Sequence, residues 1–323
     1  MNYLSLCYHY VRELNNDFPR ILGTAKNIFE DNIKMLKQNY TLIDQKDVLE
    51  FTYNNRIFND SKTGMIITFD DGLSDHYEAA KILAKNNINA IFFIPTCIIK
   101  EKFPANPTII HYCIAKYGII GFLKFYKNSL EKFNLHDKCF FIDFVSGNND
   151  TWNIIKKIKF MFKYTLDYHD ARNILIDIYK NSLLKDFPNA LELMHLTEYQ
   201  IKKILDMGHS LGTHTHTHIS VGPTKLSEEN QKLELSEPKK ILENKFNTSI
   251  KTFSYPFGEV DDCLTENGLS KYLKEYKLIF TVKEKMNTNN TSPYELGRYQ
   301  PISTDTTKIL QNKLKKIEQG LKN

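Results

Sequence analysis

A short apolar run that ends in two acidic residues constrains the fold of this chain more than any other stretch. Residues 65–69 read Met-Ile-Ile-Thr-Phe, and Asp70, Asp71 and Gly72 follow directly. The run predicts a buried strand and Gly72 predicts a turn, so both carboxylates are expected at the rim of a parallel sheet or barrel. Neighbouring carboxylates repel and need an opposite charge, a shared proton or a metal. Alternatively, they hydrate or cap a following helix.

A histidine cluster further along the chain favours the metal. Residues 208–218 read Gly-His-Ser-Leu-Gly-Thr-His-Thr-His-Thr-His, with His214 and His218 four apart. In a helical turn or in an extended segment, this spacing keeps both imidazoles on one side, where their neutral nitrogens can ligate one metal. His216 points away in a helical turn, so we expect it behind the ligands or at the surface. The pattern therefore predicts a metal site.

These motifs resemble those of the polysaccharide deacetylase family, which is carbohydrate esterase family 4 or the NodB-homology type. Residues 68–72 resemble its TFDDG motif and residues 213–218 its SHTxxH motif. Residues 254–258 (Ser-Tyr-Pro-Phe-Gly) resemble its third motif in the YPFG form. All three occur in the family's order, and the resemblance extends over roughly residues 60–100 and 195–300.

The resemblance implies a metal-dependent hydrolase that removes an N-acetyl group from an amino sugar. Asp71, His214 and His218 would hold a divalent metal, with Zn²⁺ expected and other divalent ions left open because this ligand set also suits iron. Asp70 would be the general base that activates the attacking water. The third motif, with Tyr255, Pro256 and Phe257, would contact the substrate.

Two departures from the family pattern lead to further expectations. Many members carry an arginine in the third motif that pairs with the base, whereas residues 253–257 contain none. We expect Arg298, near the end of a late strand-like segment, to supply that charge, lower the pKa of Asp70 and fix its orientation. The alternative is that Arg298 lies at the surface and forms an ordinary salt bridge.

The second departure concerns the general acid. No histidine follows His218, where many members carry a leucine-and-histidine motif. The opening Tyr8-His9-Tyr10-Val11 resembles the YHxV start of the biofilm exopolysaccharide deacetylases, in which motif order is permuted. We therefore expect His9 to be the acid that protonates the leaving amine; the alternative is a buried structural histidine.

Periodicity predicts an α/β fold. Strands are expected at 3–10, 65–70, 90–95, 209–214, 251–256, 278–282 and 295–300, with helices between them, for example at 75–85, 197–207 and 227–244. Together with the resemblance, this predicts a distorted (β/α)7-type barrel formed by one deacetylase-like domain over residues 1–323. Residues 100–195 exceed an ordinary connection and predict an inserted helical subdomain. Residues 152–163 of that insertion mix apolar and basic side chains, which allows peripheral membrane contact or, more plainly, a core-packing helix.

Composition limits the partners and the compartment. The net charge of +5 is too small for a nucleic-acid footprint, so no nucleic acid is expected. The five cysteines are scattered, and the amino terminus lacks the pattern of an export signal. Both features predict a reduced protein in the cytoplasm, either free or at the inner face of the membrane. The expected partner is an amino-sugar-containing glycan, a lipid-linked glycan or a nucleotide sugar. Two alternatives stay open: a related C–N hydrolase, such as a sugar deformylase or small-amide hydrolase, and a glycan-binding protein with a decayed site.

Overall fold

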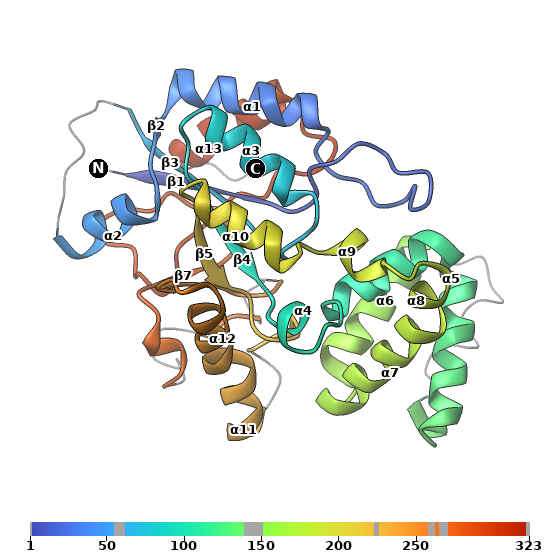
Figure 1. The fold of residues 1–323 in the computed structure, drawn as a ribbon. Helices are drawn as coiled ribbons and strands as arrows, with labels where there is room; N and C mark the ends of the chain where they lie inside the picture. Colours follow the sequence, from blue (N-terminus) through green and yellow to red (C-terminus); the bar gives the residue numbers. More distant parts are fainter. Residues whose placement is uncertain are drawn as a thin grey trace.

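A parallel sheet forms the centre of the computed structural model, which describes residues 2–54, 62–138, 151–222, 226–257, 262–264 and 271–320. Its order is β1-β3-β4-β5-β6-β7, and β2 pairs with the start of β3. The strands are β1 (Tyr3–Tyr8), β2 (Thr41–Leu42), β3 (Gly64–Phe69), β4 (Ile91–Ile94), β5 (Ser210–Thr213), β6 (Thr252–Ser254) and β7 (Leu278–Phe280). All pairings are parallel, so the carboxyl ends of these strands meet at one rim (Figure 1).

The sheet curls towards a barrel because one segment lies between its first and last strands. Leu296 forms a single bridge to Phe280 of β7, and Tyr299 forms one to Leu6 of β1. The prediction of a regular strand at 295–300 is therefore wrong, although this segment does lie beside the strands of the sheet. At Gly297 the backbone N–H turns to the Asn287 side chain (2.8 Å), which interrupts regular pairing. The expected (β/α)7-type barrel is confirmed in this curled, incompletely paired form.

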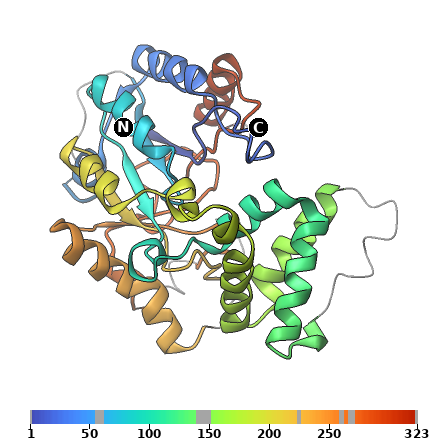
Figure 2. The same ribbon diagram turned by 45° about the vertical axis from the view of Figure 1, so that its right-hand side comes forward.

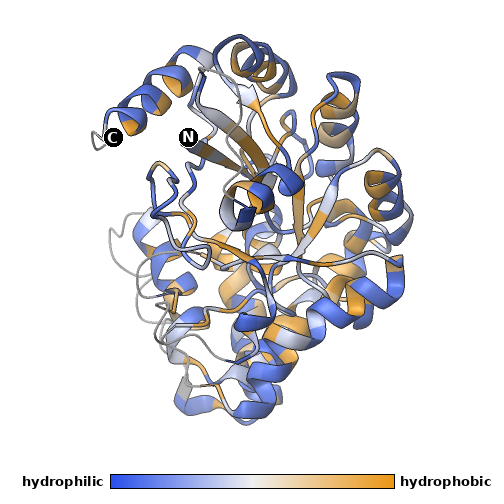
Figure 3. Cartoon of the chain, turned by 90° about the vertical axis from the view of Figure 1, so that its left-hand side faces the viewer, coloured by the Kyte–Doolittle hydropathy of each residue, from blue (hydrophilic) through white to orange (hydrophobic). Residues whose placement is uncertain are grey.

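Helices cover the outside of the sheet. They are α1 (Lys26–Asn39), α2 (Gln45–Asn54), α3 (His76–Lys85), α10 (Glu198–Asp206), α11 (Glu228–Gln231), the π-helical turn η4 (Lys232–Ser236), α12 (Glu237–Phe246), the short turn η7 (Leu273–Glu275) and α13 (Thr307–Glu318). Thr197 begins α10 with a capping box to Gln200, as its sequence favours. Hydrophobic residues lie on the strands and on the helix faces turned to the sheet (Figure 3). In this core the rings of Phe69 and Phe92 stack with their centroids 4.6 Å apart.

A second group of helices stands beside the sheet (Figure 2). It comprises α4 (Cys97–Lys100), α5 (Asn106–Lys132), η1 (His136–Lys138), α6 (Thr151–Phe160), the π-helical turn η3 (Met161–Thr165), α7 (Tyr168–Asn181), α8 (Leu183–Asp186) and α9 (Ala190–Met194). Helices α5 to α9 enclose their own apolar cluster, in which α5 packs on α7. The segment is helical, as expected for 100–195, while its status as an insertion within a single domain stays a prediction. Across the described ranges, no helix is both long and apolar enough to cross a bilayer.

Candidate metal and catalytic site

The residues of the candidate site follow three strands of the same sheet. Asp70 and Asp71 come directly after β3, His214 comes directly after β5, and Tyr255 follows β6. Since these strands are parallel, their carboxyl ends bring residues from distant parts of the sequence to one place. The same rim carries His9, which follows β1.

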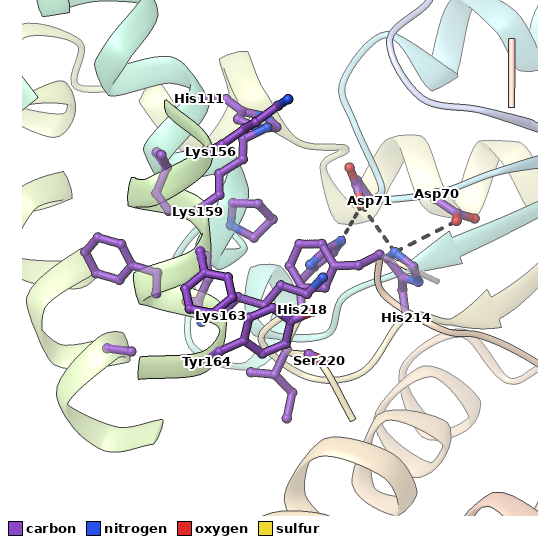
Figure 4. A pocket seen from close by; sticks show the side chains of 18 of the residues that line it. Asp70, Asp71, His111, Lys156, Lys159, Lys163, Tyr164, His214, His218 and Ser220 are labelled. Carbon is purple, nitrogen blue, oxygen red and sulfur yellow. Dashed lines mark ion pairs between the residues drawn. The ribbon is translucent and has the colours of Figure 1, made fainter. Parts of the chain in front are cut away.

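Asp71, His214 and His218 converge on one point (Figure 4). The Asp71 Oδ1 atom lies 3.2 Å from His214 Nε2 and 2.9 Å from His218 Nε2, and all three side chains are buried. His214 Nδ1 donates to the Ser254 carbonyl at 2.9 Å, so a neutral His214 turns the lone pair of Nε2 towards Asp71. Asp71 Oδ1 accepts no hydrogen bond from the described residues. A divalent cation fits this set, because it would give three converging acceptors a common partner.

The electrostatics of Asp71 agree with this arrangement. Burial alone would raise the pKa of this carboxyl, but the facing His218 and His214 hold its pKa well below the usual range. A carboxylate that stays ionised at all working pH values is a competent metal ligand.

The loops that carry these residues are strained. Asp71, Thr215, His218 and Phe257 all have positive φ angles, of 76°, 59°, 66° and 66°. Non-glycine residues adopt this conformation at a cost, and such residues gather where the surrounding structure fixes a functional geometry. Thr215 compensates in part, because its hydroxyl accepts the backbone N–H of His218 at 3.0 Å.

Glu234 of η4 holds the loop of residues 214–218, the histidine loop, in place by hydrogen bonds. Its carboxylate accepts the backbone N–H groups of His216 and Thr217 at 2.8 and 2.9 Å, and the hydroxyls of Thr217 and Tyr168 at 2.6 Å each. The side chain is fully buried. No sequence pattern distinguishes Glu234 from a solvated glutamate of a helix, so its role is visible only in the structure.

His216 is buried and takes no part in the three-residue cluster. Its Nε2 lies 2.9 Å from Glu101 and its Nδ1 2.8 Å from the Thr96 hydroxyl. The structure thus places it behind the candidate ligands and not at the surface, the two positions left open by the sequence.

Asp70 is held by Arg298. The two η nitrogens of Arg298 donate to the two carboxylate oxygens of Asp70 at 2.7 Å each. The Ser254 hydroxyl donates to Asp70 at 3.1 Å and accepts from Arg298 at 2.7 Å. Burial alone would raise the pKa of Asp70, but Arg298 and then His214 hold it far below the usual range. The structure therefore gives Arg298 the partner that the sequence suggested, and not a surface position.

His9 lines the same pocket as Asp70 and Asp71. Its Nδ1 lies 3.9 Å from the Cys7 sulfur, and its backbone carbonyl accepts from His76 Nε2 at 2.9 Å. Burial lowers the pKa of His9, while the nearby Asp71 and Asp70 raise it by less. The imidazole is thus positioned beside the two carboxylates, and its role as an acid stays a prediction.

His195 supports the Asp71–Gly72 turn, a role that is likewise visible only in the structure. Its Nδ1 donates to the Asp71 carbonyl at 3.1 Å, and its Nε2 accepts the Ala105 N–H at 3.3 Å. It thereby ties the turn after β3 to the start of the helical segment. No local pattern around residue 195 signals this contact.

A pocket with a volume of about 470 Å³ opens over the site, within the usual size of small-molecule pockets. Among the residues expected to contact substrate, Phe257 lines it and packs edge-on against His218, with ring centroids 4.8 Å apart. Tyr255 and Pro256 do not line it. The ring of Tyr255 lies in the apolar core, and contact of Tyr255 and Pro256 with substrate stays a prediction. Gly258 lies outside the described residues.

A comparison with protein families matches part of the chain. The family model described as polysaccharide deacetylase matches residues 128–276, which include the histidine motif and the motif around Tyr255. No curated protein matches the sequence.

Solved structures show the same fold at low sequence identity. The Streptococcus pyogenes deacetylase PplD, in complex with acetate, has a TM-score of 0.60 and 16% identity, with 97% of each chain covered. IcaB from Ammonifex degensii has a TM-score of 0.55 and 14% identity, with 96% of each chain covered. A de-N-acetylase from Aggregatibacter actinomycetemcomitans has a TM-score of 0.53 and 12% identity, with 97% of this chain and 99% of that chain covered.

Proposed function

Because the family model of the polysaccharide deacetylases matches residues 128–276, we propose that the protein is a metal-dependent hydrolase that removes an N-acetyl group from an amino sugar in a glycan or glycan precursor. The observation that carries this proposal is the convergence of Asp71, His214 and His218 beside the Asp70–Arg298 pair. A binding protein with a decayed site has no need of a buried base held by a bidentate arginine.

Asp71, His214 and His218 would hold the metal, with Zn²⁺ expected and other divalent ions left open. When bound, a divalent ion of this kind lowers the pKa of its water to about 7 and polarises the amide carbonyl. The chain's part is to present three ligand atoms on one side and leave the pocket side open to substrate.

Asp70 would take the proton from the attacking water. Its carboxylate is fixed by Arg298 and by the Ser254 hydroxyl, so it loses no side-chain entropy when the substrate binds. Arg298 also keeps Asp70 ionised, which a base requires before the reaction begins.

His9 would deliver a proton to the leaving nitrogen when the C–N bond breaks, which releases the amine and acetate. Its place in the pocket beside Asp70 and Asp71 supports this role, because the two anionic neighbours offset part of the burial that lowers the pKa of His9. The Cys7 thiol at 3.9 Å from Nδ1 and the bond from His76 to the His9 carbonyl hold the residue in position.

We also propose that the sugar is carried on a lipid-linked glycan or a nucleotide rather than in a finished wall polymer. A cytoplasmic location and a contact between α6 and a membrane stay predictions.

The test is metal content measured together with product release. Purified full-length protein with added Zn²⁺ should hold about one metal per chain and release acetate from N-acetylhexosamine substrates. Release of formate from N-formyl sugars without acetate would instead identify a deformylase. Asp70→Asn should keep the metal and lose turnover; turnover equal to wild type would refute Asp70 as the base, and absence of metal would refute the site.

A further inference from the structure

Two lysines of α6 line the pocket on the wall that faces the metal-site residues (Figure 4). Lys156 and Lys159 are three residues apart, so they project from the same side of the helix. The proposed hydrolysis of an acetamido group, which is uncharged, makes no use of either. Their presence in the pocket therefore requires another explanation.

Neither of these two charges has an ion-pair partner within the part of the chain that the structure describes. The next lysine along, Lys163, pairs with Asp262 at 2.6 Å and lies over the Phe257 ring, whereas Lys156 and Lys159 form no ion pair with the described residues. Among the described residues that line the pocket, Asp70 and Asp71 are the only carboxylates, and they face Arg298 and the histidines. The helical wall of the pocket is thus positively charged.

The surroundings of Lys159 make its charge sensitive to what the pocket contains. Although the side chain keeps contact with solvent, partial burial in the pocket wall lowers the pKa of Lys159. Burial, together with the nearby charge of Lys159, lowers the pKa of His111 on the same wall to about 3. An anion bound there would stabilise the charged form of Lys159 and accept hydrogen bonds from its ammonium group.

We propose that the substrate carries an anionic group, and that Lys156 and Lys159 bind this group while the acetamido group lies at Asp70 and Asp71. This inference rests on the proposed function and specifies its substrate. An amino sugar linked to phosphate, as in a nucleotide sugar or a lipid-linked precursor, carries such a group, and so does an amino sugar beside a uronic acid. A neutral polymer of N-acetylhexosamine carries none. Lysine, a compact point charge with three donors, suits either anion.

The experiment compares matched neutral and anionic ligands. Binding is measured by calorimetry on the zinc-loaded Asp70→Asn protein, which prevents turnover, with the methyl glycoside of N-acetylglucosamine, N-acetylglucosamine 1-phosphate, and a disaccharide of N-acetylglucosamine and glucuronic acid. The double substitution Lys156→Gln/Lys159→Gln is introduced into the same protein. Lys157→Gln is the matched control, because it removes the same charge from the same helix at a position that does not line the pocket.

We expect at least one anionic ligand to bind ten- to a hundred-fold more tightly than the neutral glycoside, and 0.5 M salt to reduce this preference. The double substitution should remove most of the preference, whereas Lys157→Gln should keep it. A preference for the phosphate alone or for the uronate alone identifies the source of the anion. Equal binding of all three ligands would overturn the proposal. A preference that survives the double substitution would also overturn it, because the anion would then bind elsewhere than at these two lysines.

Failure of this proposal is distinguishable from failure of the proposed function. Binding is measured without turnover, so lysine-dependent anion binding can be present even when the wild type releases no acetate from any sugar. Conversely, acetate release without any preference for anionic ligands would support the deacetylase activity and refute the anionic substrate. Thermal unfolding of each variant confirms that it is folded.

Discussion

Both η nitrogens of Arg298 reach Asp70, one to each carboxylate oxygen and each at 2.7 Å, although the two residues lie 228 positions apart in the chain. The arginine approaches from the segment that bridges β7 and β1 and not from the motif after β6. Ser254, at the end of β6, donates to Asp70 and accepts from Arg298. The Asp70 carboxylate is therefore oriented from two sides of the barrel, and its low pKa follows from this pairing.

Arg298→Lys should lower activity without removing the metal. Lysine keeps the positive charge but cannot form two parallel hydrogen bonds, so Asp70 loses its fixed orientation. We expect kcat/KM to fall about 10- to 100-fold with unchanged metal content, since misplacement by about 1 Å can cost this much. Steady-state acetate release and metal analysis of the same preparation test this. Wild-type kinetics in Arg298→Lys would mean that the pair does not position the base.

Asp71→Ala and His214→Ala should lose metal and activity together. Each substitution removes one of three ligands whose donor atoms lie within 4.8 Å of one another. Zinc titration followed by calorimetry should show that high-affinity binding is lost in both variants. His209→Ala is a suitable control, because His209 is also buried near β5 but bonds to Ala80 and Ala90 and not to the cluster. Retention of one zinc per chain in Asp71→Ala would contradict the ligand assignment.

Glu234→Gln should weaken metal binding although Glu234 touches no candidate ligand side chain. Gln has one carbonyl oxygen where Glu has two acceptors, and the second position becomes an NH₂ group facing donors. Since Glu234 accepts three hydrogen bonds from the histidine loop and one from the Tyr168 hydroxyl, we expect metal affinity to fall about 10- to 100-fold. Glu237→Gln, the same change one residue beyond η4, should keep wild-type affinity, because Glu237 pairs with Lys240 away from the loop. Equal affinity in both variants would leave Glu234 a purely structural residue.

The sequence predicts those parts of the site that local patterns encode. The apolar run before Asp70 and the four-residue spacing of His214 and His218 each place a side chain on a recognisable element. Glu234 and His195 escape such reasoning, because their partners lie 17 to 124 residues away and meet them only through helix packing. The short β2, with two residues, carries no periodicity to detect. The interrupted pairing at Gly297 depends on the Asn287 side chain, which no strand pattern reveals.

Glu101→Gln should lower stability at neutral pH and not in acid. Burial alone would raise the pKa of Glu101, but His216 and Arg172 lower it from 4.5 to about 2. A depressed carboxyl pKa gives stability that is present above about pH 4.5 and is lost as the pH falls towards 2. Wild type should therefore exceed Glu101→Gln by about 1–2 kcal/mol at pH 7, a figure kept small because the carboxylate is partly exposed. The difference should shrink by pH 3, as urea unfolding at both pH values will show. A constant difference would mean that the ionised form is not the stabilising one.

Gly212→Ala should destabilise the protein by crowding β5 between its neighbours. A Cβ atom at Gly212 would lie 2.6 Å from the Thr252 hydroxyl of β6 and would clash with the Phe93 ring of β4. Phe93 is fully buried and packs on Phe280, so the ring has no free space into which to move. Overpacking of this kind costs about 1–3 kcal/mol. Because β5 leads directly to His214, the displacement should also weaken zinc binding. Denaturant unfolding with and without zinc separates the two effects, and Ser210→Ala in the same strand, at a half-buried position, should change stability by less than about 0.5 kcal/mol. If Gly212→Ala unfolded at the wild-type denaturant concentration, the close approach of β4 and β6 to β5 would not limit this position.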